Sequence, residues 1–111
     1  MVEQRVAIVT AAGRGIGAAC ARELAARGYR LALMARSVEV VALAAQLNGV
    51  GRPGSVTEAA DLEALVAETM AVYGRIDAVV NNTGHPAKGE LLEIADGDWH
   101  AGLDLLVLNV V

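Results

Sequence analysis

The segment from Thr10 to Gly17 constrains the fold most, because it places three glycines directly after a short apolar run. That run, residues 5–10, has the near-continuous apolar character of a strand that is covered on both faces. Residues 18–27 are good helix formers, and Gly28 is expected to end their helix. A strand, a glycine turn and a helix in this order let a pyrophosphate approach bare backbone amides at the helix start. We therefore predict a phosphate-binding turn, the alternative being a tight turn that uses glycine for steric reasons alone.

The rest of the chain alternates between strand-like and helix-like segments. Residues 49–55 contain three glycines and a proline, so they form a poor strand by themselves. We expect a strand over 30–35, a helix from a Ser37 cap to Leu47 and a weak strand near 54–56. A helix capped by Thr57 and ended by Gly74 follows, and then a strand over 76–81. A loop over 82–89 leads to a last helix, which Asp96 or Asp98 opens. This alternation predicts an α/β fold whose parallel strands are joined by right-handed crossovers.

Composition and charge narrow the class of protein. The 111 residues suffice for one domain, and 55% hydrophobic residues with only 3% aromatic ones predict a core of Ala, Val, Leu and Ile. The net charge is -4 and the basic residues are scattered, which argues against nucleic-acid binding. The single cysteine, Cys20, is expected to be a small buried helix residue. The sequence contains no signal segment and no apolar run of membrane length, so we expect a cytoplasmic protein.

Three segments carry a resemblance to one known family. Residues 10–17 resemble the pattern Thr-Gly-x-x-x-Gly-x-Gly of the short-chain dehydrogenase/reductase family, with Ala11 in place of the first glycine. Residues 81–84 resemble its Asn-Asn-Ala-Gly signature, with Thr83 in place of the alanine. Residues 98–110 are similar to the helix in which the family keeps an asparagine that supports its proton relay. Within the family, the chain resembles the 3-oxoacyl carrier-protein reductase branch.

The resemblance implies a Rossmann-type doubly wound parallel sheet. Residues 1–111 would be its N-terminal half, a single NAD(P)-binding domain with about four strands and four helices that is incomplete at its C-terminus. In the family an aspartate usually stands where Ser55 stands here and holds the adenine amino group, and a serine accepts that bond more weakly. The cofactor-binding candidates are Thr10, Gly13, Arg14, Gly15, Ile16, Gly17, Arg36, Ser55, Val56, Asn81, Asn82, Thr83 and Gly84, and Asn109 is the catalytic candidate.

The end of the second expected strand bears on the choice between NAD and NADP. An acidic residue there binds the ribose 2'-hydroxyl and repels a 2'-phosphate. This chain has Arg36 at that place, and Arg14 lies within the glycine turn. Two guanidinium groups can flank a 2'-phosphate, which favours NADP; the alternative is a pair of solvated surface arginines.

The acid/base tyrosine of the family, with its lysine four residues later, is not found in this chain. Tyr29 and Tyr73 are followed at that spacing by Leu33 and Asp77, and Lys88 is the only lysine. We therefore expect the 111-residue chain alone to be inactive in hydride transfer to or from a carbonyl or alcohol substrate. Two interpretations stay open: part of an NADP-dependent carbonyl reductase, or a non-catalytic dinucleotide-binding or interaction module.

The remaining expectations concern metals and association. His85 and His100 lack a set of cysteines or carboxylates at ligand spacing, so we predict no metal site; both suit loop or surface positions, and His85 is also a candidate to border a substrate. Residues 103–111 are apolar almost all the way round a helix, which predicts burial on more than one side. Because the chain stops inside this helix without a polar cap, we interpret it as truncated or as continuing further. The same apolar tail fits a seam in a full-length homodimer or homotetramer.

Overall fold

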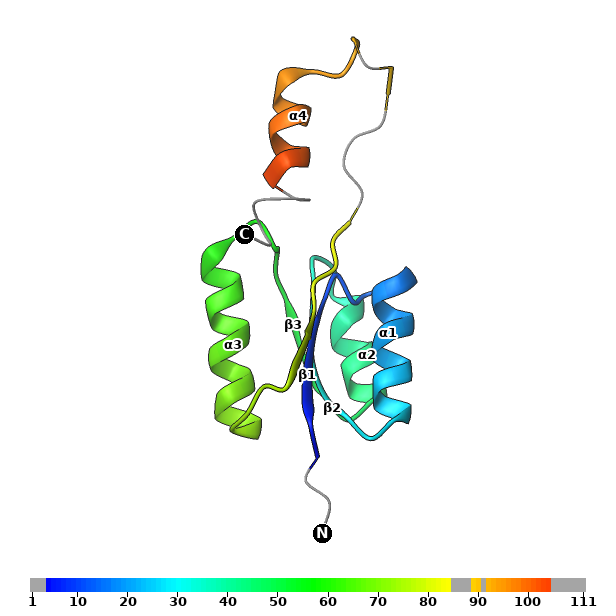
Figure 1. The fold of residues 1–111 in the computed structure, drawn as a ribbon, viewed down its shortest axis with the longest axis vertical. Helices are drawn as coiled ribbons and strands as arrows, with labels where there is room; N and C mark the ends of the chain where they lie inside the picture. The colour runs from blue at the N-terminus through cyan, green and yellow to red at the C-terminus, as the bar shows by residue number, and fades with distance from the viewer. Residues whose placement is uncertain (1–3, 85–88, 91, 105–111) are drawn as a thin grey trace.

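The computed structural model describes residues 4–84, 89–90 and 92–104, which form one parallel sheet with helices around it (Figure 1). The sheet order is β3-β2-β1-β4. In chain order the elements are β1 (Val6–Thr10), α1 (Gly15–Ala26), β2 (Arg30–Ala35), α2 (Glu39–Gln46), β3 (Val50–Pro53), α3 (Ala59–Tyr73), β4 (Ala78–Val80) and α4 (Asp96–Leu103). The predicted α/β fold with a parallel sheet of Rossmann type is confirmed.

Helices cover both faces of the sheet (Figure 1): α1 and α2 lie on one face and α3 on the other. Every residue of β1 is buried, because a central strand between two helical layers loses contact with water on both sides. Alternate residues of β1 serve the two layers. Ala7 and Val9 belong to the aliphatic cluster that includes α1 and α2, whereas Ile8 packs in the cluster that includes Leu65 of α3.

The direction of the sheet order changes at β1. From β1 the chain passes to β2 and β3 on one side, and it then returns to place β4 on the other side. In open α/β sheets, ligands bind at the carboxyl ends of the strands where this reversal occurs. The loops after β1 and β4 meet at that edge, which faces α4 in Figure 1.

The third strand lies earlier than predicted. It spans Val50–Pro53, not 54–56, and pairs with β2 from Ala32 to Ala35. Glycine lowers intrinsic strand propensity, but Gly51 is needed here because a Cβ at that position would lie 2.7 Å from the Cβ of Ala44 on α2. Close packing of β3 under α2 therefore overrides the local preference.

Three predicted helix starts are also wrong. α1 begins at Gly15 instead of residue 18, because the end of the glycine turn already forms the first helical turn. Thr57 does not cap α3, since its own amide donates to Ser55 Oγ at 3.2 Å and the helix begins at Ala59. The N-cap residue of α2 is Val38 and not the predicted Ser37, although the Ser37 Oγ accepts a hydrogen bond of 3.3 Å from the amide of Glu39.

α4 stands apart from the sheet, beyond its carboxyl edge (Figure 1). Asp96 opens this helix, and none of the residues of α4 is buried. The predicted burial of the apolar tail is not seen at Leu103, which is 49% exposed, and residues 105–111 lie outside the described part of the chain. Cys20 on α1 is half-buried where full burial was expected. Within the described ranges, no helix is long and apolar enough to span a bilayer.

Candidate functional site

Hydrogen bonds tie the end of β1 to the turn that follows β4. The hydroxyl of Thr10, at the buried end of β1, donates to the carbonyl oxygen of Asn82 at 2.7 Å and accepts from the amide of Asn82 at 2.8 Å. The side-chain amide of Asn82 donates onward to the carbonyl oxygen of Ala11 at 3.3 Å. Two predicted site segments, residues 10–17 and 81–84, are thereby brought together.

The backbone at the start of the glycine turn is strained. Ala11 has a φ of 49°, a left-handed conformation that costs a residue with a Cβ atom about 1–2 kcal/mol. The family pattern has glycine at this position, and the structure gives the physical reason for it. Sequence reasoning noted the substitution but not the strain, which only the backbone geometry reveals.

Gly17 is a steric requirement of the same turn. A Cβ at Gly17 would overlap the carbonyl oxygen of Ala11 and lie 2.8 Å from Nδ2 of Asn82. The first turn of α1 therefore presses directly against the loop that leaves β1. Glycine is required at position 17 because there is no room for a Cβ atom, whereas Gly15 is favoured because its φ of 62° is left-handed.

The N-terminus of α1 offers donors for an anion. By helix geometry the amides of Gly15, Ile16 and Gly17 have no carbonyl partner inside the helix, and the residue before it, Arg14, makes no side-chain capping bond. The first turn carries no acidic residue, a Cβ added at Gly15 would have nothing within 4 Å, and the Ile16 side chain is 76% exposed. Open amides and the positive end of the helix dipole fit the pyrophosphate of a dinucleotide.

Arg36 reaches across the end of β1 towards the turn after β4. It follows β2 directly and is exposed, and its Nη2 lies 3.5 Å from the place where a Cβ on Gly84 would stand. Gly13 of the glycine turn lies beside the end of β2, since a Cβ there would be 3.3 Å from that of Ala35. One edge of the sheet thus gathers the glycine turn, an arginine and the 81–84 turn. Arg14 is also exposed at this edge.

Ser55 and Val56 lie in the loop between β3 and α3. The Ser55 hydroxyl is 2.8 Å from that of Thr57, so part of its hydrogen-bonding capacity is used locally. Val56 is buried in the cluster with Leu65, which leaves its backbone as the part able to meet a ligand. Asp61, which sequence reasoning missed, fixes this loop because its Oδ2 accepts the Ser55 amide at 2.9 Å.

Within its described part, the structure places no further candidate residue at this edge. Asn109 and His85 lie outside the described residues, and His100 is exposed on α4. Tyr73 is a structural residue: its hydroxyl donates to the carbonyl oxygen of Leu31 at 3.1 Å, and burial raises its pKa above the usual value although Arg30 opposes the shift. The described residues contain no group of three His, Cys, Asp or Glu side chains that could hold a metal ion.

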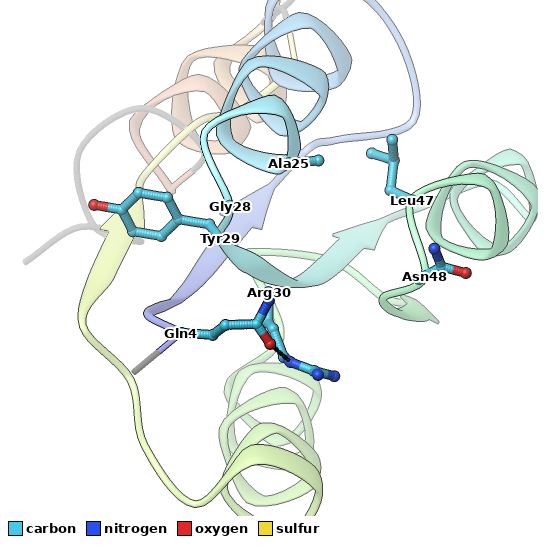
Figure 2. Close-up of a pocket in the computed structure, with 7 residues that line it drawn as sticks. All are labelled: Gln4, Ala25, Gly28, Tyr29, Arg30, Leu47 and Asn48. Carbon is cyan, nitrogen blue, oxygen red and sulfur yellow. Dashed lines mark hydrogen bonds between the residues drawn. The ribbon is translucent and has the colours of Figure 1, made fainter. Parts of the chain in front are cut away.

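A separate hollow of about 260 Å³ opens at the opposite, amino end of the strands (Figure 2). Gln4, Tyr29 and Asn48 line it together with Arg30, whose Nε donates to Gln4 Oε1 at 2.5 Å. The C-terminal ends of α1 and α2 border it, and these ends do not attract anions. We therefore place the candidate site at the carboxyl edge.

Known proteins resemble this chain over almost all of its length. A family profile described as short chain dehydrogenase matches residues 5–111. A protein described as ketoacyl reductase 1 of the granaticin polyketide synthase of Streptomyces violaceoruber is 42% identical over 95% of this chain and 40% of its own length. The 3-oxoacyl-[acyl-carrier-protein] reductase FabG of Escherichia coli is 35% identical over 97% of this chain and 44% of its own.

A solved structure of a similar protein has the same fold over the matched residues. A crystal structure of a variant actinorhodin polyketide ketoreductase with NADPH has a TM-score of 0.90 and 34% identity, and the match covers 96% of this chain and 43% of that one. The chain therefore spans less than half the length of the proteins it matches.

Proposed function

This chain belongs to the short-chain dehydrogenase family, and we propose that it forms the NADPH-binding part of a carbonyl reductase. The observation that carries the proposal is the double attachment of Asn82 to Thr10 and Ala11. This attachment builds a single edge from the glycine turn and the turn after β4. The open amides of α1 lie at that edge.

We assign the pyrophosphate to the first turn of α1. The amides of Gly15, Ile16 and Gly17 supply hydrogen-bond donors, and the helix dipole adds a partial positive charge. Gly17 keeps the turn tight against Ala11, which holds these amides in place. When bound, NADPH supplies a hydride, and the residues described here bind and orient it.

We assign the 2'-phosphate to Arg36. The end of β2 and the two residues after it read Ala35-Arg36-Ser37 and contain no carboxylate that would prefer a free ribose 2'-hydroxyl. The guanidinium is exposed beside Gly84, so it can pair with a phosphate without breaking an internal ion pair among the described residues. The NADPH bound to a related ketoreductase supports this choice.

We propose a ketone carbonyl as the group that is reduced, on the strength of the relatives named as ketoacyl reductases. The 111-residue chain alone is expected to bind NADPH without oxidising it, because no tyrosine in it is followed four residues later by lysine. Tyr73 is a poor substitute, since burial raises its pKa. A coding frame that continues to a Tyr-x-x-x-Lys motif would support the reductase, whereas a stop codon after Val111 would support a non-catalytic binding module.

Titration calorimetry of the chain with NADPH and NADH tests the cofactor assignment. Arg36→Ala is expected to weaken NADPH binding about tenfold to a hundredfold and to leave NADH binding unchanged, because a charge-assisted hydrogen bond to the 2'-phosphate is lost. Arg22→Ala, on the exposed side of α1, is the matched control and should alter neither affinity. Equal losses for both cofactors in Arg36→Ala would refute the 2'-phosphate assignment, and no binding of either by the unaltered chain would refute the proposed function.

A further inference from the structure

Two buried side-chain polar atoms lack a hydrogen-bond partner in the described part of the chain, Nε of Arg52 and Oγ1 of Thr83. Arg52 is still partly satisfied, because its Nη1 lies 3.5 Å from a carboxylate oxygen of Glu68. Oγ1 is the only polar atom of the Thr83 side chain, so this side chain makes no hydrogen bond to the described residues. A buried hydroxyl in this state costs about 1–3 kcal/mol and calls for a specific explanation.

The position of Thr83 in the chain suggests that explanation. The residue before it, Asn82, is bonded to Thr10 and Ala11 at the glycine turn. The residue after it, Gly84, lies against the guanidinium of Arg36. Thr83 therefore stands between the two groups to which we assigned the pyrophosphate and the 2'-phosphate.

We infer that the hydroxyl of Thr83 donates a hydrogen bond to a phosphate or ribose oxygen in the adenosine half of the bound dinucleotide. The inference rests on the proposed function and adds a cofactor-binding side chain to it. Alanine, the residue of the family pattern, cannot make this bond, so the contact is a property of this chain. The residue is only partly buried, and χ1 has three staggered positions, so the inference requires the one that brings the hydroxyl to the ligand.

The test compares Thr83→Val with the unaltered chain in titrations with NADPH and with adenosine 2',5'-bisphosphate, which carries the adenosine half alone. Valine keeps the shape and removes the donor, so we expect both affinities to fall about tenfold. The melting temperature without nucleotide should stay equal or rise, because an unpaired buried hydroxyl has been removed. Thr83→Ser should bind like the unaltered chain. Thr83→Ala gives a second variant without the hydroxyl and should reproduce the loss.

Thr69→Val is the matched control. Thr69 is buried on α3 and its hydroxyl donates to the carbonyl oxygen of Leu65, so its removal should change neither affinity. Unchanged binding in Thr83→Val and Thr83→Ala would overturn the inference while leaving the proposed function intact. A loss for NADPH but not for the bisphosphate would overturn the assignment to the adenosine half. If the unaltered chain bound neither probe, both proposals would fail.

Discussion

Ala11→Gly should make the protein more stable, although it removes a side-chain atom. The φ of 49° costs alanine about 1–2 kcal/mol, and glycine adopts this conformation without that penalty. Against this gain, glycine loses roughly 0.5–1 kcal/mol more backbone entropy on folding. The lost methyl group is only half-buried, so its transfer term is a fraction of about 0.8 kcal/mol. The balance favours Ala11→Gly by roughly 0.5 kcal/mol, or about 2–4 °C in melting temperature.

Thermal and urea unfolding followed by circular dichroism measure this difference. Ala19→Gly is the matched control, because Ala19 is exposed in the middle of α1, where glycine costs about 1 kcal/mol. The two substitutions remove the same methyl group and should change stability in opposite directions, which separates them by about 1.5 kcal/mol. If Ala11→Gly destabilised the protein as much as Ala19→Gly does, the strain assigned to the turn would be refuted.

Two further predictions concern the same edge and the opposite end of the sheet. Gly17→Ala should lower the free energy of unfolding in urea by about 1–3 kcal/mol or more and weaken nucleotide binding, because the added Cβ would overlap the carbonyl oxygen of Ala11. Gly97→Ala is the control and should leave the free energy of unfolding almost unchanged, because an added Cβ there has nothing within 4 Å. Asp77→Asn should lower the melting temperature at neutral pH. The hydrogen bond from Arg75, together with that from the Val6 amide, lowers the pKa of the Asp77 carboxyl below its ordinary value of 3.8. The ionised carboxylate therefore stabilises the folded state above pH 3.8, and this stabilisation is lost as the pH falls through the lower pKa of the folded state. Equal pH dependence of unfolding in both proteins would contradict this assignment.

The fold could be predicted from the sequence where the side-chain pattern and the tertiary environment agree. β1 and the inner residues of β2, 31–34, are almost continuously apolar, and both are buried between helical layers. The glycine turn was identified from its place between a strand and a helix, and the structure brings it to the 81–84 turn. The position of each segment directly after a strand is enough to predict that they lie at the same edge, because parallel strands place their carboxyl ends together.

The remaining features depend on contacts between distant segments. The strand β3 was predicted too late in the chain because its glycines lower the local strand propensity. Its position is decided instead by the close packing of Gly51 on Ala44 and by the pairing with β2. Thr57 is an exception that depends on a local contact: it has the chemistry of a helix cap, but its amide and hydroxyl are hydrogen-bonded to the hydroxyl of Ser55. No pattern in the sequence reveals a positive φ at an alanine or a hydroxyl without a partner.

Two of the departures from the family pattern, Ala11 and Thr83, both cost free energy and both adjoin Asn82. Backbone strain of about 1–2 kcal/mol and an unpaired hydroxyl at about 1–3 kcal/mol are substantial beside the 5–15 kcal/mol that typically holds a domain together. Strain and unsatisfied polar groups persist where the surrounding structure determines them, and they concentrate at functional sites. Here Thr10 and Asn82 provide that surrounding structure with three hydrogen bonds, at 2.7, 2.8 and 3.3 Å. The costs therefore coincide with the edge at which we propose that the amides of α1 and the guanidinium of Arg36 bind the nucleotide.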